Sequence, residues 1–87
     1  MITIVSQNKA LINISNFNTI FVEEDDANKP IVVVDVDGSN YILGTYRTIE
    51  DCVQIINWIA TGIAQYKTTD NITLTMPLKV SDNETET

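Results

Sequence analysis

The chain has 87 residues, a net charge of −7 and no histidine. This length predicts one domain with a modest hydrophobic core. Twelve acidic against five basic residues give a surface that repels phosphate backbones, which argues against direct nucleic-acid binding. No apolar run reaches the ~18 residues that a membrane-spanning helix needs. The first residues also lack the basic and apolar parts of a signal peptide, so we expect a cytoplasmic protein without membrane contact.

Alternating apolar residues predict short strands in the first part of the chain. In one run, Ala10, Ile12 and Ile14 share a face at the period of two that a β-strand requires. Polar turns separate the runs, and residues 24–30 form a solvated connection to the next one. The strands expected here are residues 2–5, 10–14 and 19–23.

The most strand-like segment runs from Ile31 to Val36, because its first four residues are all β-branched. Apolar side chains on both faces indicate a central strand. The Asp37-Gly38 step that follows predicts a tight hairpin, since glycine accepts the positive φ that such turns need. In the next strand, Gly44 predicts a β-bulge or a close approach of another backbone.

From Ile49 to about Tyr66 the apolar residues recur at helical spacing. Thr48 is a suitable N-cap, and Asp51 lies three residues later, near a capping-box arrangement. Beyond this helix, alternation returns over residues 72–80. These residues predict a sixth strand or an extended arm. Pro77 has no N–H to donate, which argues for an edge position or an extended arm.

These elements predict an α+β fold. An antiparallel meander sheet of five to six strands is expected to pack against one long helix near the C-terminus. Residues 1–80 form the single predicted domain, and residues 81–87 are expected to be a disordered acidic tail.

The residue types that usually carry catalysis are scarce. Cys52 is the only cysteine, so no internal disulfide is possible. The absence of histidine removes the commonest general base and the commonest zinc ligand. We therefore expect no enzymatic activity, no metal and no cofactor.

The segment from Ile31 to Ser39, with Asp35 and Asp37 near its end, resembles the first motif of haloacid-dehalogenase-type phosphatases. The resemblance implies Asp35 as nucleophile and Asp37 as general acid, with Mg²⁺ between them. It covers nine residues, and the family also needs a longer doubly wound fold and a later lysine. The alternative is an outward-facing Asp35 followed by a turn.

The acidic residues form a second candidate site. The run from Glu23 to Asp26, with Asp35 and Asp37, could hold a cation or imitate nucleic-acid phosphates. Nothing in their spacing matches a calcium-binding loop, and a solvated rim is the simpler interpretation. The members of this group are Glu23, Glu24, Asp25, Asp26, Asp35 and Asp37.

The predicted helix has an apolar arc that is too wide for contact with one sheet. The strip beside its core-facing side contains Trp and Tyr, which are enriched in interface cores. We hypothesise that this strip contacts a protein partner, specifically a second copy of the chain; the alternative is that residues 72–78 fold back over it. The strip consists of Ile55, Trp58, Gly62 and Tyr66.

Several short pieces resemble a group of small uncharacterised proteins from Gram-positive bacteria and their phages. The pieces are Ser6-Gln7, Ile12-Asn13 with Asn16, and Leu43 to Thr48 with Glu50. In that group a similar short sequence joins the last strand to the helix. The resemblance implies a mobile-genetic-element setting and no particular activity.

Three functions follow from these patterns. The first is a non-catalytic protein–protein interaction module that self-associates through the helix strip. The second is an acidic inhibitor that imitates nucleic acid and binds a host nucleic-acid-binding protein. The third is a Mg²⁺-dependent phosphatase that uses Asp35 and Asp37.

Overall fold

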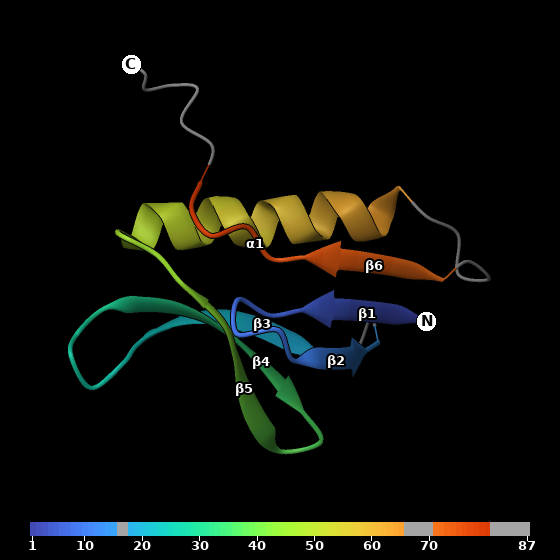
Figure 1. The fold of residues 1–87 in the computed structure, drawn as a ribbon, viewed down its shortest axis with the longest axis horizontal. Helices are drawn as coiled ribbons and strands as arrows, with labels where there is room; N and C mark the ends of the chain where they lie inside the picture. Colours follow the sequence, from blue (N-terminus) through green and yellow to red (C-terminus); the bar gives the residue numbers. More distant parts are fainter. Residues whose placement is uncertain (16–17, 66–70, 81–87) are drawn as a thin grey trace.

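Six strands and one helix form the part of the chain that the computed structural model describes, which is residues 1–15, 18–65 and 71–80 (Figure 1). The predicted tail at residues 81–87 lies outside these residues. In chain order the elements are β1 (Ile2–Val5), β2 (Leu11–Ile14), β3 (Thr19–Glu24), β4 (Pro30–Val36), β5 (Ser39–Thr45), α1 (Ile49–Ala64) and β6 (Ile72–Thr75).

The α+β class is confirmed, but the single meander sheet is wrong. The described strands form two three-stranded sheets, with the orders β2-β1-β6 and β3-β4-β5. β1 is antiparallel to β2 and parallel to β6, whereas β4 is antiparallel to both neighbours. The prediction failed because the alternation of apolar residues determines which face of a sheet a residue occupies, but not which strand lies next to it.

The helix is not the last element: β6, expected as a sixth strand or an extended arm, follows it and returns to pair with the first strand. A parallel pair needs a long crossover, and α1 provides it by carrying the chain back to the start of β1. Ile2 of β1 then pairs with Ile72 of β6. β6 lies at the sheet edge but is shorter than the expected residues 72–80: it ends at Thr75, so Pro77 is not part of the strand.

The local predictions for the second sheet are confirmed. All four residues from Ile31 to Val34 are buried in β4, the central strand. Asp37 and Gly38 form the turn to β5 with φ of 53° and 87°. The pairing shifts near Gly44, so that Val32 faces Gly44 while Val33 faces Ile42. This shift is the predicted bulge, and it places Leu43 fully inside the core.

α1 begins as predicted, because the Thr48 side chain accepts a hydrogen bond of 3.0 Å from the Asp51 N–H. Its buried residues are Cys52, Ile55 and Ile59, which lie about one turn apart on one face. This face packs on β3 and β4. Within the described residues, no helix is long and apolar enough to cross a membrane.

The core lies where both sheets meet the helix. Burying a large aliphatic side chain contributes roughly 1.5–3 kcal/mol, and Ile4, Leu43 and Ile59 have almost no exposed surface. Ile4 comes from the first sheet, Leu43 from the second and Ile59 from α1. One shared core therefore joins the elements, although the sheets are separate.

Candidate functional site

Residues 76–80, which follow β6, cross the surface beside α1 and are fixed there by hydrogen bonds. The N–H of Met76 donates to the Val5 carbonyl at 2.9 Å, which extends the pairing with β1. The Pro77 carbonyl accepts from the Tyr46 hydroxyl at 2.8 Å and from Gln7 Nε2 at 3.0 Å. We call residues 76–80 the C-terminal segment, since it forms a wall of both grooves described below.

Gln7 joins three parts of the chain at this segment. Its Oε1 accepts from the Thr45 N–H at 2.8 Å, while its Nε2 donates to Pro77 and to Leu78. The side chain has room because Gly44 has no β-carbon: one placed there would lie 2.8 Å from Gln7 Cδ. The close approach predicted at Gly44 is thus a contact with a side chain.

Tyr46 is buried between this junction and α1. Burial raises its pKa to about 12, with a smaller opposing effect from the hydrogen bond with Gln7. The hydroxyl therefore stays protonated and continues to donate to Pro77 at neutral pH. Its role here is to hold the C-terminal segment in place.

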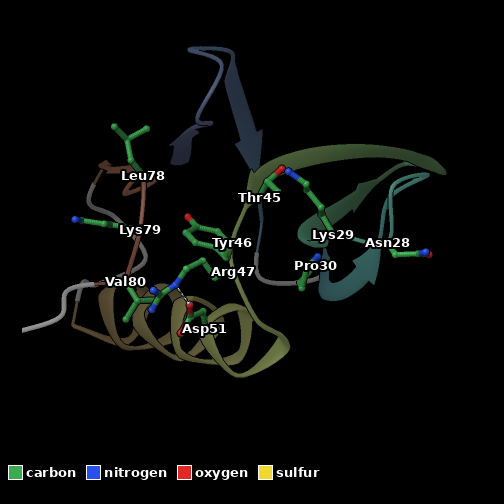
Figure 2. A pocket seen from close by; sticks show the side chains of 10 residues that line it. All are labelled: Asn28, Lys29, Pro30, Thr45, Tyr46, Arg47, Asp51, Leu78, Lys79 and Val80. Atoms are coloured by element: carbon green, nitrogen blue, oxygen red, sulfur yellow. Dashed lines mark ion pairs between the residues drawn. The ribbon is translucent and has the colours of Figure 1, made fainter. Parts of the chain in front are cut away.

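The first groove, of about 490 Å³, lies on one side of the C-terminal segment (Figure 2). Three of the chain's five basic residues line it, although the whole chain has a net charge of −7. Figure 2 shows Lys29 and Lys79 on opposite sides, with Tyr46 and Arg47 between them. The lining residues are Asn28, Lys29, Pro30, Thr45, Tyr46, Arg47, Asp51, Leu78, Lys79 and Val80.

The charge of this basic groove is only partly balanced within the chain. Asp51 is the acidic residue that lines it, and its Oδ2 lies 3.8 Å from Arg47 Nε. In the described part of the chain, Lys29 and Lys79 form no ion pair. The groove is therefore a local cationic surface on an acidic protein, suited to acidic groups of a partner.

A second groove, of about 320 Å³, lies on the other side of the same segment. It shares Lys79 and Val80 with the basic groove and adds Gln54, Ile55, Trp58 and Pro77. Trp58 is 43% exposed, and Leu78 on the segment is 78% exposed. The face that contains both grooves thus combines exposed apolar side chains with cations.

No family model, no curated protein and no solved structure matches this chain.

The described residues of the predicted helix strip differ in how far the rest of the chain covers them. Ile55 is 3% exposed and belongs to the core. A β-carbon on Gly62 would lie 3.1 Å from Leu74 Cδ2 in β6, so this glycine is covered within the chain. Trp58 remains open, and Tyr66 lies outside the described residues. The return of the chain over the helix, which was the alternative, accounts for Gly62 and leaves Trp58 available.

The structure also separates the predicted acidic group. Glu23 to Asp26 lie at the start of β4 and Asp35 with Asp37 at its end, about 20 Å apart along an extended strand. Asp25 accepts from the N–H groups of Ala27 and Lys29, both at 2.9 Å, and Asp35 accepts from Gly38 at 3.0 Å. These two carboxylates stabilise turns, while Glu23, Glu24 and Asp26 are exposed.

The surroundings of Asp35 differ from those of the phosphatase motif. That motif needs a parallel strand followed by a crossover, whereas β4 is antiparallel to both neighbours and leads into a hairpin. Among residues 1–15, 18–65 and 71–80, no group of three or more Asp, Glu, His or Cys side chains could hold a metal ion.

Proposed function

We propose that this protein is a non-catalytic interaction module that self-associates through the face formed by the C-terminal segment and its two grooves. The observation that carries the proposal is the exposure of Trp58 in a groove where Ile55, from the same helix, is buried. Of the large exposed apolar side chains among the described residues, Trp58 and Leu78 are the two that line these grooves.

An exposed tryptophan next to a hollow surface is a typical centre of a protein interface. Aromatic side chains bring a large contact area at a small entropic cost, and Trp is the most enriched residue at energetic hot spots. With 43% of its surface exposed, Trp58 has about 100 Å² to bury. Burial of that area contributes on the order of 2 kcal/mol, or a roughly 30-fold change in affinity.

The basic groove gives the same face a polar rim. A core of apolar contacts surrounded by charged and polar groups is the usual anatomy of an interface between proteins. An acidic inhibitor that imitates nucleic acid would instead need one continuous acidic surface, and the acidic residues lie at opposite ends of β4. We place the protein in the cytoplasm, where a free cysteine such as Cys52 stays reduced.

The test compares the solution mass of the wild type with that of two variants by size-exclusion chromatography with light scattering. Trp58→Asp should weaken self-association by about 30-fold. Asn57→Asp is the matched control, because it adds the same charge at the next, exposed helix position and should leave the mass unchanged. A wild type with the mass of one chain at every concentration, or equal behaviour of both variants, would contradict the proposal.

A further inference from the structure

The exposed acidic residues at the end of β3 lie next to the basic groove. Asp25 accepts a hydrogen bond from the Lys29 N–H at 2.9 Å, so Lys29 closes the acidic turn. The Lys29 side chain also lines the groove. The acidic turn, defined here as Glu23, Glu24 and Asp26, and the cationic surface therefore have a common border.

Neither surface is neutralised within the described part of the chain. The ion pair there joins Arg47 to Asp51, which leaves Lys29 and Lys79 without an acidic partner. Glu23, Glu24 and Asp26 are also exposed and unpaired. Two complementary charged surfaces that lie side by side and do not pair with each other can pair between two molecules.

From this arrangement we infer that the partner in the basic groove is the acidic turn of a second copy of the same chain. A two-fold axis that passes between the two surfaces brings each acidic turn over the groove of the other copy, so both contacts form at once. Leu78 lines the basic groove and lies at this contact, and Lys79 and Val80, which line both grooves, connect it to the groove beside Trp58. The inference rests on the proposed self-association and identifies the surface that meets the groove.

The charges in this arrangement determine orientation more than they determine affinity. Exposed ion pairs are individually weak, whereas complementary patches select the register in which two surfaces meet. Salt dependence is a poor test, because salt weakens both these contacts and the long-range repulsion between two chains of charge −7. Reversing charges at named positions separates the two effects.

The experiment uses two double variants. The groove variant carries Lys29→Glu and Lys79→Glu, and the turn variant carries Glu24→Lys and Asp26→Lys. Each alone places like charges across both contacts of the pair, and we expect self-association to fall at least about tenfold. When the two are mixed, the reversed groove faces the reversed turn and the native groove faces the native turn. The mixture should therefore form a one-to-one complex with about the affinity of the wild type.

General attraction cannot produce this rescue, because both variants stay net negative: two reversals shift the net charge of −7 by four, to −11 in the groove variant and to −3 in the turn variant. Lys9→Glu controls for added negative charge, since Lys9 does not line the groove, and it should associate like the wild type. Circular dichroism checks that each variant is folded. Sedimentation velocity measures the masses, with the turn variant labelled by a fluorophore.

The outcomes separate the two claims. A monomeric wild type overturns the proposed self-association itself. A wild type that associates, with a mixture that stays monomeric, overturns the pairing of groove and turn and leaves the self-association standing. Recovery of the complex in the mixture, with loss in each variant alone, supports both.

Discussion

The side chain of Gln7 occupies the space in which a β-carbon of Gly44 would lie, and from there it binds Thr45 and Pro77. These residues come from the β1–β2 turn, from β5 and from the C-terminal segment. The contact ties both sheets to the wall of the two grooves. A change at this junction should therefore alter both the stability of the fold and the shape of the proposed interface.

Replacement of Gly44 by alanine should destabilise the protein by about 1–3 kcal/mol, because the new methyl group displaces the Gln7 amide from its hydrogen bonds. Chemical denaturation measures the change. In a Gln7→Ala background these bonds are already absent, so the same replacement should cost clearly less. An equal cost in both backgrounds would show that Gln7 is not what requires glycine at this position.

Tyr46 should make stability fall at high pH. Because burial raises its pKa in the folded chain to about 12 from 10.0, the unfolded chain loses the proton first as pH rises. The contribution of Tyr46 to the free energy of unfolding is therefore fully present below about pH 10, and it decreases by about 2 kcal/mol between pH 10 and 12. Tyr46→Phe should remove this part of the decrease, whereas Tyr41→Phe, at a half-exposed tyrosine, should leave it. Denaturation midpoints across this pH range provide the measurement.

The buried thiol of Cys52 should resist modification. Its side chain is 0% exposed, and burial, followed by the charge of Asp51, raises its pKa. Since the thiolate is the reactive form, iodoacetamide should label the folded chain much more slowly than the denatured chain. Mass spectrometry of timed samples follows the reaction. Equal rates with and without denaturant would mean that this part of the core is open.

Substitutions at Gly62 test whether β6 covers this part of α1. Alanine at this position gains up to about 1 kcal/mol of helix propensity, but its methyl group would lie 3.1 Å from Leu74. Because Leu74 is only partly buried, it can move slightly, and we expect Gly62→Ala to change stability by less than about 1 kcal/mol. Gly62→Leu should destabilise the chain by pushing β6 away from the helix. Thermal unfolding distinguishes these cases, and a tolerated leucine would show that β6 does not pack there.

Local signals in the sequence predicted the local structure. The β-branched run at Ile31, the glycine after Asp37 and the N-cap at Thr48 each act through their own backbone or their nearest neighbours, so the sequence is enough to place them. The pairing of β1 with β6 joins residues 70 positions apart, as between Ile2 and Ile72. No periodicity encodes such a partner, and the sheets were therefore assigned incorrectly.

The candidate site could likewise be predicted from local patterns only in part. The width of the apolar arc on α1 pointed to Trp58, but whether its neighbours are covered depends on where β6 returns. The basic groove was missed because Lys29, Arg47 and Lys79 are widely spaced along the chain and meet only in the fold. The sequence offered one signal for this groove: the chain has few basic residues, and these three lie beside turns or helix ends.

The central claim is that two copies meet at Trp58, and the most direct measurement is the fluorescence of this residue during dilution. Trp58 is the only tryptophan in the chain, so its emission reports on this surface alone. The account predicts a shift to longer wavelength on dilution, as the indole becomes hydrated, over the concentrations at which the solution mass falls from two chains to one. An emission maximum that stays constant while the mass halves would place the contact elsewhere and contradict it.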